Sequence, residues 1–348
     1  MNLELSPIIW NDITPLRKLL ENPGKRIVIM IHVNPDGDAL GSSLGLLRLM
    51  EKLGHNCSVI SPNDYPEFLK WMPGTDRVII MESSSALAIE TLQNADVIFA
   101  VDFNDLSRVK KLDEVVAASP AFKVLIDHHP NPSIKADCIL SDISSSSTAE
   151  LTYRLIKEAG LSSRMDKDTA SCLFVGIMTD TGCFSYNSSN RKTWETVAEL
   201  LDYGIEKDRL YYLTYDNYSA DRLRLLGFSL NEKMEVFPEY RTGLIWLTRS
   251  DLRRFNFAVG DTEGFVNYPL SIRGIRFSAL FIEKKDHVRI SLRSKGDFPV
   301  NDFSRKYFNG GGHANASGGE SYLSIEDTVK RFKELLPGYK DQLADYEN

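Results

Sequence analysis

Short apolar segments alternate with amphipathic segments over roughly the first two hundred residues. The apolar segments contain almost no polar side chain in their interiors and occupy Arg26–Val33, Cys57–Ser61, Arg77–Met81, Asp96–Asp102 and Phe122–Asp127. Strands that are covered by helices on both faces have this composition. Amphipathic stretches at Ala39–Leu53 and Asp105–Ala118 separate some of them, as βαβ units require. The pattern predicts an α/β domain with a parallel sheet and helices on both faces.

The pattern becomes helical after Asp142. Four helices are expected, at Thr148–Ala159, Lys167–Met178, Asn190–Leu201 and Glu206–Tyr212. The serine run Ser144–Ser147 is interpreted as a capping segment ahead of the first of them. Residues 206–234 are polar-rich and helical without neighbouring strands, so we expect a connector there.

From Tyr240 onward, strands and helices alternate again on a smaller scale. The sequence predicts three strands, at Thr242–Leu247, Ile275–Ile282 and Val288–Leu292. A turn at Glu283–His287 joins the last two. After them we expect a helix at Asn301–Phe308, a glycine-rich loop at Asn309–Gly319 and a helix at Ser324–Leu336. We therefore expect a larger domain over residues 1–205, the helical connector over residues 206–234, and a smaller α/β domain over residues 235–348.

Composition is typical of a globular protein, and the charge is unevenly distributed. The 348 residues are 43% hydrophobic and 26% charged, and the formal net charge is −7. This charge argues against a protein that wraps long duplex nucleic acid, which needs a basic surface. Residues 1–210 carry net −8, whereas residues 249–306 carry net +5. The basic stretch favours a small anionic ligand for the second domain.

The sequence favours a soluble cytoplasmic protein with no membrane partner. Its four cysteines form no CxxC pair and lie in or beside apolar runs, as reduced thiols do. The N-terminal MNLELSPIIW lacks the pattern of a signal peptide, and the apolar runs are far shorter than the roughly 20 residues of a membrane span. The sequence leaves open whether the chain forms a homo-oligomer.

Polar residues that can bind metals follow the predicted strands. His32, Asp36 and Asp38 follow the first strand, Asp102 ends the fourth, and the triplet Asp127-His128-His129 ends the fifth. Ligands bind at the carboxyl ends of the strands in open α/β sheets. Taken singly, such residues are usually caps or turn formers. Their coincidence at three strand ends predicts that they converge, together with Asp180 at the end of a helix.

Convergence would place four carboxylates in a small space: Asp36, Asp38, Asp102 and Asp180. Four like charges without counter-ions repel one another strongly. Two divalent cations would cancel them, with His32 and His128 as neutral ligands. Imidazole and carboxylate ligands without thiolates favour Mn²⁺, leaving Zn²⁺, Fe²⁺ and Co²⁺ open and making Mg²⁺ less natural. Two ions about 3.5–4 Å apart suit phosphoester hydrolysis.

The motifs resemble those of a known superfamily. They are His32-x-Asn34-Pro35-Asp36-Gly37-Asp38-Ala39, Val101-Asp102-x-x-Asp105-x-x-Arg108, Asp127-His128-His129, Thr179-Asp180-Thr181-Gly182 and Gly310-Gly311-Gly312-His313. In this order they resemble the four motifs of the DHH phosphoesterase superfamily and the signature of its associated C-terminal domain. The length is similar to that of the nanoRNase/pAp-phosphatase branch and shorter than the RecJ exonucleases.

This resemblance implies a role for each matching residue. One metal ion would be held by His32, Asp36 and Asp102, and the other by Asp38, Asp102, His128 and Asp180, with Asp102 bridging. Asp127 and His129 would orient the ligands or contact the scissile phosphate. Arg108, in the second motif, is a candidate for substrate binding.

The second domain offers its own candidates for phosphate binding. The backbone amides of Gly310–Gly312 could approach a phosphate closely, and His313 supplies a nearby donor. Arg293 could clamp a phosphate with its planar guanidinium, and Arg276 is a weaker candidate of the same kind. The competing interpretations are a flexible turn for the glycines and solvated surface cations for the arginines.

Together these features predict a Mn²⁺-dependent phosphohydrolase acting on short oligoribonucleotides and small phosphonucleotides. The resemblance implies release of 5′-mononucleotides from nanoRNA and dephosphorylation of 3′-phosphoadenosine 5′-phosphate (pAp). A phosphodiesterase for the dinucleotide pApA, formed in cyclic-dinucleotide turnover, is the nearest alternative. An inorganic pyrophosphatase or exopolyphosphatase is disfavoured by the Gly310–His313 loop, and an inactive nucleotide sensor by the complete ligand set.

Overall fold

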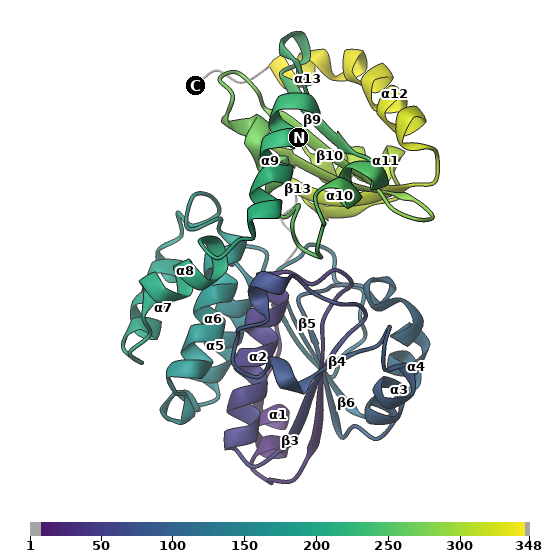
Figure 1. The fold of residues 1–348 in the computed structure, drawn as a ribbon. Coiled ribbons are helices and arrows are strands. Elements are labelled where there is room, and N and C mark those ends of the chain that lie inside the picture. Colours follow the sequence, from purple (N-terminus) through teal and green to yellow (C-terminus); the bar gives the residue numbers. More distant parts are fainter. Residues whose placement is uncertain (1–7, 345–348) are drawn as a thin grey trace. The chain divides into compact units, whose positions relative to one another are not determined.

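The computed structural model describes residues 8–344 and divides into two compact units (Figure 1). The first unit is Met1–Asn217 and the second is Tyr218–Asn348. The division falls within the predicted connector, so that helix α8 (Lys207–Tyr215) belongs to the first unit and α9 (Ala220–Glu232) to the second. In the described part of the chain, no helix has both the length and the apolar character needed to cross a membrane.

The first unit is built on a seven-stranded sheet in the order β1-β7-β6-β5-β2-β3-β4. The strands are β1 (Ile9–Trp10), β2 (Arg26–Met30), β3 (Asn56–Ser61), β4 (Val78–Ile80), β5 (Val97–Val101), β6 (Phe122–Asp127) and β7 (Cys138–Ser141). Every neighbouring pair is parallel except β1 with β7. The predicted fold class is therefore confirmed, and the five predicted strands are present. The sequence analysis missed β1 and β7, which are only two and four residues long.

Helices cover both faces of this sheet because successive strand residues point to opposite sides. Ile27 and Ile29 of β2 pack into one core with α1, α2, α5 and α6, whereas Val28 and Met30 pack into another with α3 and α4 (Figure 1). The helices are α1 (Thr14–Leu20), α2 (Gly37–Lys52), α3 (Ser85–Gln93), α4 (Asp113–Ala118), α5 (Thr148–Glu158), α6 (Lys167–Asp180) and α7 (Arg191–Leu201). Helix α3 was not predicted, and the helix expected at Asp105–Ala118 is a 3-10 helix, Leu106–Leu112, followed by α4.

Helices α2 and α6 cross at very short range, and glycines make this approach feasible. Gly37, Gly41 and Gly45 recur every fourth residue along α2. A Cβ atom on Gly41 would lie 2.5 Å from the backbone oxygen of Cys172 in α6, and one on Gly37 would lie 2.3 Å from Oγ1 of Thr179. The start of α2 therefore lies against the end of α6. This contact brings the segment around Asp38 next to the segment around Asp180.

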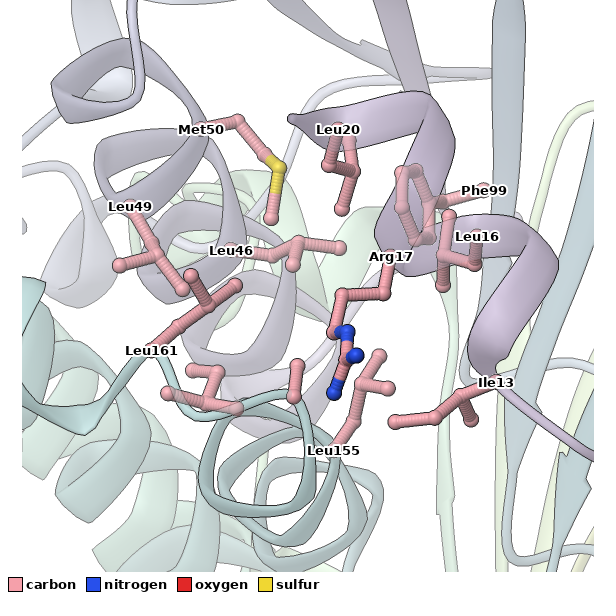
Figure 2. A pocket seen from close by; sticks show the side chains of 12 residues that line it. Ile13, Leu16, Arg17, Leu20, Leu46, Leu49, Met50, Phe99, Leu155 and Leu161 are labelled. Carbon is pink, nitrogen blue, oxygen red and sulfur yellow. The ribbon is translucent and has the colours of Figure 1, made fainter. Parts of the chain in front are cut away.

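A small cavity between α1, α2 and α5 is a packing void of the core (Figure 2). Its volume is about 10 Å³, and its lining is apolar apart from Arg17. A space of this size accommodates about one water molecule, which would need polar partners to stay there. The cavity is too small for a substrate.

The second unit contains a six-stranded sheet in the order β12-β13-β11-β10-β9-β8. Its strands are β8 (Met234–Phe237), β9 (Thr242–Leu247), β10 (Phe277–Glu283), β11 (Val288–Ser294), β12 (Gly311–His313) and β13 (Ala316–Ser321). Only β9 and β10 pair in parallel; the other neighbours are antiparallel. The expected loop at Asn309–Gly319 was wrong in part, since most of it forms the β12–β13 hairpin.

This sheet is also covered on both faces. Helices α11 (Val300–Tyr307) and α12 (Ile325–Leu335) pack on one side, where the ring of Phe332 in α12 contacts those of Phe277 and Phe281 in β10. Helices α9 and α10 (Arg249–Arg254) contribute to the core on the other side. Helix α13 (Lys340–Ala344) ends the described chain.

Candidate metal centre

The predicted ligands gather at the carboxyl ends of three adjacent strands. In the sheet β5 lies between β2 and β6. His32 follows β2, Asp102 follows β5 directly, and His128 follows β6 directly. Asp180 is the last residue of α6 and comes to the same place through the close crossing of α6 with α2. Chain topology thus brings together residues that are about 150 positions apart.

Asp102 lies at the centre of this group. Its Oδ2 is 3.4 Å from Nε2 of His32, and its Oδ1 is 3.8 Å both from Nε2 of His128 and from Nδ1 of His129. The carboxylate is buried, and the backbone at Asp102 has φ = 66°, a left-handed conformation that is uncommon outside glycine. The backbone amide donates to the carbonyl oxygen of Ile126. The sharp turn directly after β5 therefore points this side chain into the site.

Among the described residues, three groups of possible ligand atoms contain Asp102, and two of these groups consist entirely of predicted metal ligands. Atoms of His32, Asp36 and Asp102 lie within 4.8 Å of one another, and so do atoms of Asp38, Asp102 and His128. The carboxylate of Asp180 adds to the second set, 3.5 Å from Nε2 of His128. These distances bring together all six residues that the sequence analysis named as metal ligands.

The histidines are oriented so that Nε2 can act as a ligand. Nδ1 of His32 is 2.8 Å from the carbonyl oxygen of Val33, and Nδ1 of His128 is 3.3 Å from that of Ser145. A carbonyl oxygen accepts only, so we assign the proton to Nδ1 in both rings. The lone pair of each Nε2 then faces the carboxylates. Histidines that bind metals are usually held by such a bond on the other nitrogen.

The electrostatics of the site also fit divalent cations. Burial raises the pKa of Asp38 well above its usual value, and the nearby carboxylates of Asp102 and Asp180 raise it further. Burial also opposes ionisation of Asp102. When no cation occupies the site and the nearby histidines are protonated, a hydrogen bond from His32 and the positive charges of the histidines outweigh burial and lower the pKa of Asp102. Crowded carboxylates of this kind are stabilised by bound cations, which supply the missing positive charge.

Asp127 and His129 form a tight pair at the edge of this group. Asp127 accepts a bond from the backbone amide of His129 (3.0 Å) and lies 2.7 Å from Nδ1 of the same residue. Burial, with the charge of Asp102, raises the pKa of Asp127 to about 7, and burial lowers that of His129 well below its usual value. Near neutral pH the pair can therefore hold and release a proton.

Arg108 also contributes charge to the first unit's site. It belongs to the 3-10 helix Leu106–Leu112, and its carbonyl oxygen accepts a bond from the amide of Val33. Its positive charge works against protonation of His32 and His129. The charge of Arg108 is therefore felt within the site, and Arg108 stays a predicted substrate-binding residue.

The glycine-rich hairpin of the second unit contains glycines of two kinds. A Cβ on Gly310 would lie 2.0 Å from the carbonyl oxygen of Gly318, and one on Gly312, at φ = 135°, would lie 2.6 Å from that of Ala316. Packing and conformation therefore require glycine at both positions. Gly311 lies between them with open space where its Cβ would be. Gly311 is half-buried, and the open space on its Cβ side is where a ligand could approach the hairpin.

The two candidate arginines of this unit lie in different surroundings. Arg293 is half-buried on β11 opposite Ala316, and its guanidinium donates to the carbonyl of Leu292 (3.0 Å). Arg276 is buried and donates to Asp297 and to the carbonyl of Leu343. These contacts tie α13 to the sheet and favour a structural role for Arg276 over the predicted one. We leave it out of the substrate-binding set.

The sequence analysis missed the contribution of the segment before α5. The serine run was interpreted as a capping segment only, and Ser147 does cap α5 by accepting from the amide of Glu150. The adjacent Thr148 also contacts two of the predicted ligands, Asp38 and Asp102. The position of the serine run could have indicated this role. The run follows β7, which is parallel to β6, so the two strands end at the same edge of the sheet.

Comparison with known proteins places both units in one family. The DHH family, N-terminal domain, matches residues 26–177, and the DHHA1 domain matches residues 250–338. The chain is 30% identical over 301 residues to the bifunctional oligoribonuclease and PAP phosphatase NrnA of Bacillus subtilis (strain 168), spanning 85% of this chain and 89% of that protein. It is 28% identical over 342 residues to NrnA of Thermus thermophilus, spanning 97% and 96%.

Among solved structures, an exopolyphosphatase-related protein from Bacteroides fragilis has the same fold over nearly the whole chain. The TM-score is 0.90 at 44% sequence identity, covering 96% of this chain and 97% of that one. The predicted resemblance is therefore confirmed for both units. The chain belongs to the DHH family of phosphoesterases, in the branch that carries a C-terminal DHHA1 domain and includes the NrnA proteins.

Proposed function

We propose that this phosphoesterase hydrolyses short oligoribonucleotides to 5′-mononucleotides and removes a phosphate from pAp, using two Mn²⁺ ions. The observation that carries the proposal is the arrangement around Asp102, whose two oxygens face separate sets of ligand atoms. The names of the Bacillus and Thermus relatives, bifunctional oligoribonucleases and PAP phosphatases, support the substrate class.

The donor set suits two ions of this type. His32 and Asp36 would hold one ion and Asp38, His128 and Asp180 the other, with Asp102 shared between them. Bound divalent ions would activate water and neutralise charge on the phosphate. The mixture of imidazole nitrogen and carboxylate oxygen, without thiolate, favours Mn²⁺ over softer alternatives.

Residues beside the ligands supply the other chemistry that hydrolysis needs. In the Asp127–His129 pair, Nδ1 of His129 lies 3.8 Å from Oδ1 of Asp102. The pair can take up or release a proton near neutral pH. Arg108 provides positive charge for a phosphate oxygen. We propose that these three residues contact the scissile phosphate or the water that attacks it.

The second unit would bind the part of the substrate that does not react. Its candidates are Arg293, His313 and Gly311, which has open space on its Cβ side, with Gly310 and Gly312 shaping the hairpin. The net charge of +5 over residues 249–306 favours an anionic ligand. Substrates of a few nucleotides fit this charge distribution, because the acidic first part of the chain would repel a long polyanion.

A substrate panel with Mn²⁺ tests the proposal. The panel comprises pAp, pApA, RNA dimers to pentamers, pyrophosphate and a short polyphosphate, the last added because of the name of the Bacteroides relative. Turnover of pAp and of RNA dimers to pentamers is expected. Turnover of pApA alone would indicate a pApA phosphodiesterase. Turnover of pyrophosphate or polyphosphate alone would indicate an inorganic pyrophosphatase or an exopolyphosphatase. Tight nucleotide binding without any hydrolysis would indicate a sensor.

A further inference from the structure

The segment 145–149, which ends in the first turn of α5, forms hydrogen bonds with three of the proposed metal ligands. The amides of Thr148 and Ala149, in the first turn of α5, donate to Oδ2 and Oδ1 of Asp38 at 2.6 and 2.9 Å. The hydroxyl of Thr148 donates to Oδ1 of Asp102 at 2.8 Å. The carbonyl oxygen of Ser145 lies 3.3 Å from Nδ1 of His128.

These bonds fix orientation without using up the ligand atoms. A carboxylate oxygen has two lone pairs, so each oxygen of Asp38 that accepts an amide can still bind a cation. The bond on Nδ1 of His128 leaves Nε2 available. The amino end of a helix also carries partial positive charge, which favours an ionised carboxylate at Asp38.

Buried side chains that bind no metal hold this segment in place through further hydrogen bonds. Glu150, which is buried, accepts bonds from the amide and hydroxyl of Ser146 and from the hydroxyl of Thr193 in α7. Asp142 accepts from the amide and hydroxyl of Ser144. The positions of the donors are therefore determined by the fold before any ion binds.

We infer that Thr148 is a positioning residue, which sets the orientation of Asp38 through its backbone amide and of the bridging Asp102 through its hydroxyl. This inference rests on the proposed two-metal function. It states that the hydroxyl group of Thr148, a residue that does not itself bind metal, strengthens the binding of Mn²⁺ by the neighbouring ligands. Positioning partners of metal ligands typically change affinity or activity by about 10- to 100-fold.

Thr148→Val isolates this hydroxyl, because it preserves the backbone amide and the side-chain shape. We expect Mn²⁺ affinity, measured from the electron paramagnetic resonance signal of free Mn²⁺, to weaken by about 10- to 100-fold. Thr148→Ser, which restores the donor, should recover most of the affinity. Turnover of pAp under limiting Mn²⁺ should follow the same order.

Thr152→Val is the matched control, one turn further along α5. Thr152 is fully buried, and its hydroxyl has no hydrogen-bond partner among the described residues. The same replacement there should leave Mn²⁺ affinity unchanged. A role of the Thr148 side chain in packing alone predicts equal affinities for the two valine variants and would overturn the inference. If Thr148→Val does not fold, Thr148→Ala is compared with Thr152→Ala under the same criterion.

The wild-type titration separates the inference from the proposed function. If the wild-type protein binds no Mn²⁺, the proposed function fails and the inference fails with it. If the wild-type binds Mn²⁺ and hydrolyses pAp, but Thr148→Val binds as tightly as wild-type, only the positioning role is overturned. Weakened binding with a melting temperature within a few degrees of wild-type supports the inference.

Discussion

The two units position their candidate functional residues in different ways. In the first unit, most of the ligands follow three adjacent parallel strands and meet at one edge of the sheet, where His32, Asp38, Asp102 and His128 are buried. In the second unit, the candidates lie on β11 and on the β12–β13 hairpin of a largely antiparallel sheet, and they are half-exposed. The first arrangement fixes atoms relative to one another, and the second presents groups to a ligand.

This difference has a consequence for mutagenesis. Asp102 contacts several groups at once, so its loss removes a shared element that no neighbour can replace. Arg293 and Gly311 each contribute one group to a surface, so the loss of either should weaken binding by a limited factor. The comparison therefore predicts an all-or-none response in the first unit and a graded response in the second.

Asp102→Asn should produce the largest effect. Replacing one oxygen of the shared carboxylate with an amide nitrogen removes a ligand atom from one proposed metal site and the shared negative charge from both, so we expect kcat/KM for pAp to fall by more than about 1000-fold. Asp96→Asn is the control, at the other end of β5, where Asp96 pairs with exposed Arg26. Residual activity of Asp102→Asn within tenfold of wild-type would contradict the bridging role.

Gly41→Ala should markedly destabilise the first unit. An alanine methyl group would lie 2.5 Å from the backbone oxygen of Cys172, so α2 and α6 must separate. We expect a loss of about 3 kcal/mol in the free energy of unfolding, measured by urea titration. Gly227→Ala in α9, where a Cβ meets open space, should instead gain up to about 1 kcal/mol from helix propensity. Equal small effects would mean that the helix crossing tolerates a methyl group.

Arg293→Ala tests the graded response of the second unit. We expect KM for pAp and for RNA dimers to rise about tenfold, the size of one lost charge-assisted hydrogen bond, while hydrolysis of a small artificial phosphodiester is unchanged. Gly311→Ala and His313→Ala should show the same selectivity. An equal loss of activity on nucleotides and on the artificial substrate would indicate that these residues are structural.

The smallest effect concerns pH-dependent stability at Asp166, which caps α6. Burial opposes its ionisation, but bonds with Lys52 and with the amide of Thr169 outweigh burial and lower its pKa to about 2. Ionised Asp166 therefore stabilises the folded protein fully above pH 3.8, the pKa of this carboxyl in the unfolded chain. This stabilisation is lost as the pH falls through about 2.

Asp166→Asn retains the helix cap but removes the charge. It should cost less than about 1 kcal/mol at pH 7, because the ion pairs of Asp166 are partly exposed. The variant should also lose less stability than wild-type between pH 4 and pH 2, as measured by thermal melting. Identical pH profiles for the two proteins would contradict the assigned role of Asp166.

The sequence was sufficient for the elements whose signals are local. The buried strands of the first unit, the helix predicted at Asn190–Leu201 and the strand Thr242–Leu247 were predicted close to their observed bounds. Convergence of the ligands was also predictable, because parallel strands end at a common edge. The short strands β1 and β7 were not, since a few residues carry no distinct pattern.

Tertiary contacts account for the features that the sequence did not indicate. The roles of Gly310 and Gly312 depend on backbone atoms of the facing strand, and the burial of Arg276 depends on a C-terminal helix 67 residues away. Thr148 looked like an ordinary residue at a helix start. Its contact with Asp102 joins positions 46 residues apart, and neither periodicity nor spacing encodes such a bond.

The most direct test of the account is the number of Mn²⁺ ions that the wild-type chain binds, measured by equilibrium titration on protein first stripped of metal. Two ions per chain are expected, with turnover of pAp lost on stripping and restored in parallel with occupancy. Fewer than two ions at saturation, or full turnover by the stripped protein, would contradict a paired metal centre built around Asp102.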